Sequence, residues 1–361
     1  MTVTSAPAAL PKTTRKIVLN RDERGHYSWR LVEGPVPTVG DHEVLLRVRA
    51  VSLQRSDLET IWVLNDPSFE GAFGMGERDR TGQVVGSDAA GEVVGVGRLV
   101  KSVKPGERVT SLYFYDYVDG PLTAEKQKEG RGDYTGGVFG DYVIVEETGL
   151  APQPPGLTYE EACTLPAAGL TAWMATLGND LVRSGDTVVI QGTGGVSTFA
   201  LQFVTAAGAN AIVTSSSDDK LEHARRLGAK GGINYKQTPN WADRVRELTN
   251  GRGADVVIDM GGKGTATQSV ECLKYYGTVV LVGAVGSYEE AIPCVPLLQK
   301  NVRAQGVYIG SRADFMRMSS FITAHHLHPI VHRTYPLEQY SQAVKDLETG
   351  NVSGRVVMRL V

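Results

Sequence analysis

Apolar residues in the second half of the chain form short β-branched runs that alternate with segments of helical periodicity. Residues 188–190 (Val-Val-Ile) are typical of a buried strand in a parallel sheet. Further strands are expected at 211–214, 232–235, 255–259 and 277–283, and helices at 199–207, 220–227 and 241–249. Strands that alternate with helices at this spacing predict an α/β fold with a doubly wound parallel sheet, which we assign to residues 157–316.

The first 150 residues have a different pattern, in which short strands are separated by Gly, Pro and Asp turns. Strands are expected at 16–19, 43–52, 91–97 and 142–145. This predicts a mostly β domain of the partly open barrel type, over residues 1–156 with 1–13 as a loose tail. A sixth strand of the parallel sheet is expected to end at 308–310, and a helix to span 315–324. The apolar run 356–361 predicts a strand that returns to the first domain, so that residues 317–361 complete it.

A glycine-rich turn follows the strand at 188–190. Gly192, Gly194 and Gly195 precede a helical pattern, and Ser197 stands where a dinucleotide-binding fingerprint has its third glycine. Such glycines let a pyrophosphate approach the backbone, and the free N–H groups of the helix start hold its charge. Serine is small enough to keep the helix close to the strand. The turn and its alternating context therefore predict a dinucleotide site.

The end of the second strand distinguishes NADP from NAD. An NAD site places an acidic residue here to bind the ribose 2′-hydroxyl, whereas this chain has Ser215, Ser216 and Ser217, followed by Lys220. Hydroxyls and an ammonium suit a 2′-phosphate, and Tyr235 could flank it. We therefore favour NADPH. The alternatives are that Asp218 or Asp219 binds a 2′-hydroxyl, and that Ser217 and Asp218 cap a helix.

Composition narrows the class of protein. The chain has 361 residues, 42% hydrophobic and 21% charged, which suits a globular enzyme with two domains. A net charge of −3 and a pI of about 6.2 argue against a nucleic-acid partner. No apolar run approaches the roughly 18 residues that span a membrane. The N-terminal residues do not resemble a secretion signal. Three scattered cysteines fit a reducing cytoplasm.

Several motifs occur in the order found in the medium-chain dehydrogenase/reductase superfamily, which the chain resembles from about Lys16 to Val361. They are the segments 43–52, 86–97 (GSDAAGEVVGVG), 104–109 (KPGERV), 168–173 (AGLTAW) and 192–196 (GTGGV). The resemblance implies a GroES-like domain before a Rossmann domain, as in zinc alcohol dehydrogenases and in zinc-free quinone and enoyl reductases. It also implies a homodimer, formed by pairing the sixth strands at 302–309.

The resemblance also indicates that no catalytic zinc is bound. A catalytic zinc needs three ligands from Cys, His or carboxylate side chains. The three positions that hold them in zinc alcohol dehydrogenases match Gln54, Ser87 and the segment 166–169 (PAAG). Residues 111–137, which match the structural zinc lobe, contain no Cys. Asp88 is a carboxylate, but it alone does not make a site. The histidines from His325 to His332 follow a helix end, and we do not assign them to a metal.

Site residues follow from the same comparison. Gln54, Arg55 and Ser56 match the segment that meets the nicotinamide and phosphates, with Ser56 at the proton-relay position of alcohol dehydrogenases. Catalytic candidates are Gln54, Ser56, Tyr113 and Tyr115, and candidates for the pocket wall are Trp62, Tyr113, Phe114 and Tyr115. The residues expected to bind the cofactor are Arg55, Thr171, Gly192, Thr193, Gly194, Gly195, Val196, Ser215, Ser216, Ser217, Lys220, Tyr235, Gly261, Ala284, Val285, Tyr308 and Ile309.

These observations favour a zinc-independent, NADPH-dependent reductase of an activated C=C bond or a quinone. Hydrogen-bond donors can stabilise the enolate that hydride addition creates, without a Lewis acid. We expect a small, hydrophobic or planar carbonyl or quinone substrate. Two alternatives stay open: a carbonyl reductase or alcohol dehydrogenase that uses Ser56 as proton relay, and a cofactor-binding partner protein without catalysis.

Overall fold

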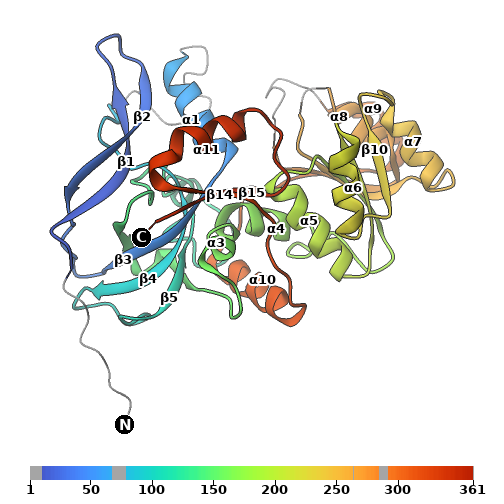
Figure 1. The fold of residues 1–361 in the computed structure, drawn as a ribbon. Helices are drawn as coiled ribbons and strands as arrows, with labels where there is room; N and C mark the ends of the chain where they lie inside the picture. The colour runs from blue at the N-terminus through green and yellow to red at the C-terminus, as the bar shows by residue number, and fades with distance from the viewer. Residues whose placement is uncertain (1–9, 67–78, 263, 284–291, 361) are drawn as a thin grey trace.

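Two main sheets organise the computed structural model, which describes residues 10–66, 79–262, 264–283 and 292–360 (Figure 1). One sheet has six strands, all parallel, in the order β10-β9-β8-β11-β12-β13. Its strands are β8 (Thr187–Gln191), β9 (Asn210–Ser215), β10 (Gly231–Asn234), β11 (Ala254–Asp259), β12 (Leu273–Leu281) and β13 (Arg303–Gly306). This is the parallel sheet that the sequence predicts.

Helices cover both faces of the six-stranded sheet because successive strand residues point to opposite sides. Val188 and Ile190 of β8 pack in one core cluster with Phe203 of α5, whereas Val189 between them packs with Trp241 of α7. The helices of this part are α4 (Leu170–Met174), α5 (Gly195–Ala206), α6 (Asp218–Arg226), α7 (Trp241–Leu248), α8 (Ala266–Glu271), α9 (Cys294–Lys300) and α10 (Arg312–Ala324). The doubly wound prediction is confirmed.

The second sheet is built largely from the first part of the chain. We call this sheet and the elements packed on it the β-rich part of the molecule. Its strands are β3 (Glu43–Leu53), β4 (Asp88–Val96), β5 (Arg108–Ser111), β6 (Tyr142–Glu146), β7 (Leu150–Pro152), β14 (Val331–Pro336) and β15 (Arg355–Arg359). A separate hairpin joins β1 (Thr13–Arg21) to β2 (Tyr27–Pro35). The remaining helices are α1 (Arg55–Asn65), α2 (Ala124–Gln127), α3 (Tyr159–Ala162) and α11 (Tyr340–Glu348).

The end of the chain returns to this β-rich sheet, as the apolar run at 356–361 predicts. Strand β15 pairs antiparallel with β3, with Val357 opposite Ser52. Figure 1 shows the red elements β14, α11 and β15 on the side of the molecule that holds the blue β3. The expected loose tail begins in residues outside the described part of the chain, but Thr13 already belongs to β1. The domain boundaries themselves stay predictions.

The predicted sixth strand is too long. Strand β13 ends at Gly306, so Tyr308 and Ile309 lie beyond it. Ile309 has a φ of 55°, a left-handed conformation that a β-branched residue rarely adopts and that ends extended structure. The chain then turns toward the β-rich part, where the Arg312 N–H donates to the Tyr117 carbonyl at 2.8 Å.

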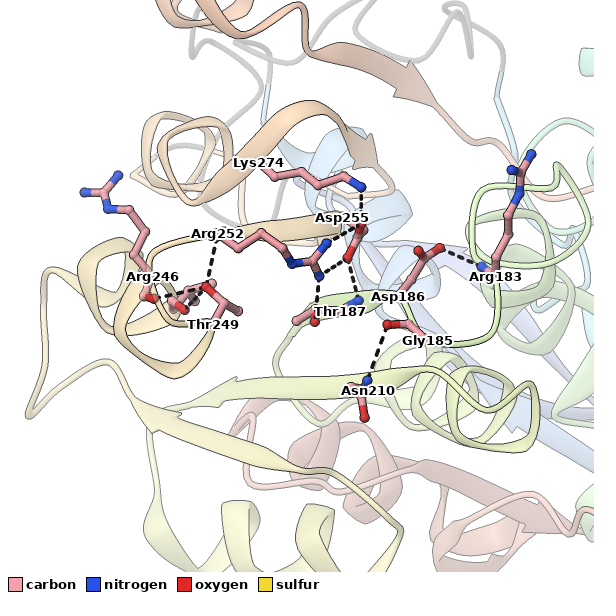
Figure 2. A network of polar contacts seen from close by, with 12 residues as sticks. Arg183, Gly185, Asp186, Thr187, Asn210, Arg246, Thr249, Arg252, Asp255 and Lys274 are labelled. Atoms are coloured by element: carbon pink, nitrogen blue, oxygen red, sulfur yellow. Dashed lines mark hydrogen bonds and ion pairs between the residues drawn. The ribbon is translucent and has the colours of Figure 1, made fainter.

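A polar network holds the six-stranded sheet together at its amino end (Figure 2). Asp255 of β11 is buried and accepts a hydrogen bond from the Thr187 N–H of β8 at 2.7 Å. It also forms an ion pair with Arg252 at 2.5 Å. Lys274 of β12 forms a second ion pair with it. One carboxylate thus links three neighbouring strands at the edge opposite the glycine turn. None of the described helices is long and apolar enough to cross a membrane.

Candidate functional site

A cleft of about 720 Å³ runs between the carboxyl ends of the parallel strands and the β-rich part of the molecule. Parallel α/β sheets place ligands at this edge. Most of the site residues that the sequence suggests line it: Gln54, Arg55, Ser56, Tyr113, Thr171, Gly192, Thr193, Gly194, Gly195, Val196, Ser215, Ser216, Lys220, Tyr235, Tyr308 and Ile309. Residues that lie far apart in the sequence therefore meet in one cavity.

Three of the suggested residues do not line the cleft. Tyr115 instead lies beside Gly149. A Cβ atom added to Gly149 would be 3.1 Å from the Cα and Cβ atoms of Tyr115. Ser217 is the N-cap residue of α6, and the Gly261 N–H donates to the side chains of Gln191 and Asp259 at 3.1 and 3.0 Å. Ala284 and Val285 lie outside the described residues.

Of the aromatic candidates for the pocket wall, Tyr113 lines the cleft, whereas Trp62 and Phe114 lie elsewhere. Trp62 is exposed, with the Arg55 guanidinium 5.3 Å from its ring centroid. Phe114 is buried and packs edge-on against Tyr113, with the ring centroids 4.7 Å apart. The structure instead lines the cleft with the aromatic rings of Tyr113, Tyr134, Tyr235 and Tyr308.

The glycine turn has the geometry that a pyrophosphate needs. Gly192 has a φ of 75°, and an added Cβ on Gly194 would meet no atom within 4 Å. The backbone there faces open space at the start of the twelve-residue helix α5, where free N–H groups favour an anion. The Ser197 hydroxyl donates to the Gln191 carbonyl of β8 at 2.7 Å. The serine in the third glycine position thus bonds to the strand that it approaches.

Hydroxyl and ammonium groups gather at the end of β9. Ser215, Ser216 and Tyr235 line the cleft with Lys220, whose Nζ donates to the Gly350 carbonyl at 2.6 Å. Burial and the nearby charge of Lys236 lower the pKa of Lys220. The negative charge of an anion bound beside Lys220 would offset both effects. This end of the cleft suits a phosphate group.

The competing acidic residue is engaged elsewhere. Asp218 accepts hydrogen bonds from Asn234 at 2.9 Å and from Gln237 at 2.8 Å, and it does not line the cleft. These two bonds lower the pKa of its carboxyl group. Asp219 is not among the lining residues either.

The positions that match the zinc ligands lie in the same region of the structure, but their side chains are not zinc ligands. Gln54 and Ala167 line the cleft, and the Gln54 amide donates to the Ser87 hydroxyl at 2.6 Å. Across residues 10–66, 79–262, 264–283 and 292–360, no group of three or more His, Cys, Asp or Glu side chains is placed to hold a metal ion. The late histidines are dispersed: His328 contacts Glu161 at 2.8 Å, and His325 stacks on Phe321.

Asp88, the one carboxylate near these positions, is paired with an arginine that the sequence reading overlooked. Arg355 lies 3.4 Å from Asp88 and donates to the Ser52 hydroxyl at 2.9 Å. Burial raises the pKa of Asp88 to about 7, although Arg355 opposes the shift. Arg355 lines the cleft and also contacts the glycine turn, since a Cβ on Gly195 would lie 2.3 Å from its Cδ.

The start of α1 explains the residues around Ser56. Gln54 is the N-cap, and its N–H donates to the Asp57 carboxylate at 2.7 Å. Asp57 therefore acts from the first turn of the helix. Ser56 lines the cleft, and its carbonyl accepts the Thr60 hydroxyl at 3.0 Å.

A chain of hydroxyl groups ends on a carboxylate at the wall of the cleft. The Tyr113 hydroxyl donates to Asp133 and lies 3.2 Å from the Tyr308 hydroxyl, while the Thr60 hydroxyl lies 2.7 Å from the other Asp133 oxygen. All four residues line the cleft. Burial raises the pKa of Asp133, and burial together with Asp133 raises that of Tyr113. Burial also raises the pKa of Tyr308 to about 12.

Sequence reasoning missed Asp133 and Arg355. Asp133 lies in an irregular segment without a recognisable motif, and it reaches Tyr113 because Phe114 and Gly130 pair as an isolated bridge. For Arg355 a signal did exist: a charged residue directly before the apolar run 356–358 is unusual in a buried strand.

Comparisons with known proteins agree with this architecture. Residues 40–155 match the model of the alcohol dehydrogenase GroES-like domain, and residues 195–324 match that of the zinc-binding dehydrogenase. A zinc-type alcohol dehydrogenase-like protein of Schizosaccharomyces pombe is 39% identical over 284 residues, which cover 77% of this chain and 82% of the relative. A crotonyl-CoA reductase of Streptomyces collinus is 27% identical, over 97% of this chain and 88% of its own.

Solved structures give the same result. A Sinorhizobium meliloti protein described as a candidate alcohol dehydrogenase superposes with a TM-score of 0.88 at 34% identity, covering 98% of this chain and all of its own. A 2-octenoyl-CoA carboxylase reductase, solved with NADP and 2-octenoyl-CoA, superposes with a TM-score of 0.82 at 26% identity, over 98% of this chain and 88% of its own.

The parallel sheet, the β-rich part and the cleft between them define a two-part oxidoreductase of the nucleotide-dependent dehydrogenase and reductase class. Within that class, the chain belongs to the medium-chain dehydrogenase/reductase superfamily. The resemblance and the fold class that the sequence predicts are both confirmed.

Proposed function

We propose that the protein is a zinc-independent, NADPH-dependent reductase of an activated C=C bond or a quinone. The observation that carries this proposal is the composition of the cleft wall. Where a zinc enzyme would present metal ligands, this chain presents the Gln54 amide beside Ser87, with the Tyr113 and Tyr308 hydroxyls also lining the cleft. These groups are hydrogen-bond donors, and donors suffice to stabilise an enolate oxygen.

Residues along the cleft fit an NADPH molecule. The glycine turn from Gly192 to Gly195 would hold the pyrophosphate, and Ser215, Ser216 and Lys220 would hold the 2′-phosphate. The coenzyme, when bound, supplies the hydride. Solved relatives in complex with NADP support this choice of cofactor.

The substrate end of the cleft is aromatic and only partly polar. Tyr113, Tyr134 and Tyr308 line it together with Leu53 and Ile309, so a planar or hydrophobic substrate fits the surface that it meets. Two relatives are named crotonyl-CoA reductases, and crotonyl-CoA contains a C=C bond conjugated to a thioester, which supports the same reaction class.

The second candidate is a carbonyl reductase or alcohol dehydrogenase. Ser56 favours it, because its side chain lines the cleft at the position where alcohol dehydrogenases keep a hydroxyl relay. The two reactions differ in product. Given an enone and NADPH, a C=C reductase returns the saturated ketone, whereas a carbonyl reductase returns the allylic alcohol.

The experiment is NADPH oxidation with a panel of quinones, enones, enals and simple aldehydes, followed by product analysis. Saturated carbonyl products support the proposal. Allylic alcohols as the main products would replace it with carbonyl reduction, and Ser56→Ala would then abolish turnover. Absence of turnover with the whole panel, despite tight NADPH binding, would contradict both.

We also propose that the protein is a homodimer. Strand β13 is at the edge of the parallel sheet and pairs with β12 on one side only, so its outer backbone groups can pair with those of a second copy. Light scattering should give twice the mass of the 38.8 kDa chain. Replacing Ala304 with proline should then yield monomers if the pairing is correct.

A further inference from the structure

We propose that Asp133 is the proton store of the cleft and that it supplies, through the hydroxyls of Tyr113 and Tyr308, the proton that the reduced substrate takes up. The inference rests on the proposed function and deepens it by naming the proton source. It begins from a geometric fact: the three side chains form a continuous line of oxygen atoms from Asp133 to Tyr308.

The outer end of this line faces the cleft. Tyr308 is 45% exposed, whereas Tyr113 is 4% exposed and is screened from bulk solvent. Tyr308 is therefore the group that can touch the substrate, and Tyr113 acts through it. The left-handed backbone of Ile309, at a φ of 55°, lies directly beside Tyr308 at the cleft wall. Strain of this kind persists where the surroundings fix the geometry of the chain.

The inner end of the line is satisfied in both protonation states of Asp133. When Asp133 is ionised, Tyr113 and Thr60 both donate to it. When the proton sits on the oxygen near Tyr113, the carboxyl group donates to the Tyr113 hydroxyl, whose own proton can turn to the Tyr308 hydroxyl 3.2 Å away, while Thr60 still donates to the other oxygen. The carboxyl group therefore keeps hydrogen-bond partners whether it is ionised or protonated.

Proton transfer along the line balances the reaction. As hydride reaches the β carbon, the electron pair of the C=C bond moves toward the carbonyl and creates an enolate. The Tyr308 O–H bond breaks and a new O–H or C–H bond forms on the substrate. Tyr308 regains a proton from Tyr113, and Tyr113 regains one from the Asp133 carboxyl group. Asp133 lines the cleft itself, so water can return its proton after the product leaves.

The charges around Asp133 suit this role. Burial raises the pKa of Asp133. Hydrogen bonds from Tyr113 and Thr60 and the charge of Arg80 lower the pKa, but by less, so the net shift is upward. The other titratable groups that feel its charge are Asp57, Tyr134 and Tyr308. The carboxyl group therefore stays protonated at higher pH than an exposed Asp, whose pKa is about 3.9.

The first test is the pH dependence of turnover with a substrate that the panel identifies. The wild-type rate should fall as pH rises through the pKa of Asp133, and Asp133→Asn should remove this dependence and lower kcat by roughly 100-fold or more. Combining Asp133→Asn with Tyr113→Phe should lower kcat no further, because both changes interrupt one line. Tyr117→Phe is the matched control: it removes a buried hydroxyl that donates to Gly120 outside the cleft, and it should leave turnover unchanged.

The second test needs neither coenzyme nor substrate, so it separates failure of the relay from failure of the proposed function. The infrared difference between wild type and Asp133→Asn should show a protonated carboxyl band that persists above the pH at which exposed carboxyl groups ionise. Tyr113→Phe and Thr60→Val should move its midpoint upward, because each removes a donor to the ionised form. A band that titrates with exposed carboxyl groups and ignores both variants would overturn the relay, as would a full rate in Asp133→Asn.

Discussion

Arg355 and Asp88 form an ion pair, 3.4 Å long, in which both side chains are buried beside the glycine turn. Removing one partner of such a pair leaves a charge without compensation, at a cost of about 3–5 kcal/mol. We expect Arg355→Met to lower the free energy of unfolding by about that amount at pH 8, as measured by chemical denaturation.

The loss in Arg355→Met should be smaller at about pH 5. The pKa of Asp88 is raised to about 7, so the carboxyl group is neutral there and no unpaired charge remains. The double variant Asp88→Asn, Arg355→Met is the control, and it should show little of this pH dependence. Equal losses at both pH values would contradict the assignment of the effect to Asp88.

Lys220 should determine the preference for NADPH. Its ammonium group lines the phosphate end of the cleft, and a charge-assisted hydrogen bond contributes about 1.5–3 kcal/mol. Lys220→Ala should therefore raise the Kd of NADPH at least roughly ten-fold, measured by fluorescence titration. NADH is the internal control, since it lacks the phosphate; a similar loss for both cofactors would show that Lys220 does not contact the 2′-phosphate.

The purified protein should contain no stoichiometric zinc. The positions that match the catalytic ligands are Gln54, Ser87 and Ala167, and none of these side chains is a usual zinc ligand. Elemental analysis should find far less than one zinc per chain, and a chelator should leave NADPH oxidation unchanged. One zinc per chain, together with activity lost to the chelator and restored by zinc, would refute the prediction.

Asp255 should stabilise the parallel sheet in a pH-dependent way. Burial raises the pKa of its carboxyl group, but hydrogen bonds from Arg252, Lys274 and the Thr187 backbone outweigh burial and leave the pKa lowered. A lowered pKa in the folded state means that the stabilisation is complete above the ordinary Asp value of about 3.9 and is lost as the pH falls below it.

Asp255→Asn should accordingly lower the free energy of unfolding by about 1.5–3 kcal/mol at neutral pH, the usual contribution of hydrogen bonds to a charged group. The difference between wild type and variant should shrink in acid. Asp243→Asn is a suitable control, because its ion pair with Arg246 is exposed and should contribute little. A difference that stays constant from neutral pH into acid would argue against a role for the Asp255 charge.

The sequence predicts most of the fold because local patterns dictate it. The β-branched runs at 188–190 and 255–259 and the glycines at 192–195 specify strand, turn and helix without any distant contact. The end of the sixth strand could not be predicted in this way. After β13 the chain crosses to the β-rich part, where the Arg312 N–H bonds to the Tyr117 carbonyl. This hydrogen bond joins residues far apart in the sequence.

The same limit applies to the site. Gly192, Ser215 and Lys220 belong to a contiguous motif whose geometry is local, and all three reach the cleft. Asp133 acquires its role only because folding brings it to Tyr113, and Tyr115, two residues from Tyr113, points elsewhere. In an irregular segment no periodicity tells which neighbouring side chain faces the cleft.

The pairing of β15 with β3 has a consequence for how the molecule is made. Arg355 bonds to Ser52 across 303 positions of the chain, and β3 lies between β15 and β4 in the sheet. During synthesis residues 50–53 of β3 must therefore stay unpaired on the side that β15 later covers, until the whole parallel sheet has emerged from the ribosome. Contacts this distant in sequence slow folding, and an unpaired apolar strand invites aggregation.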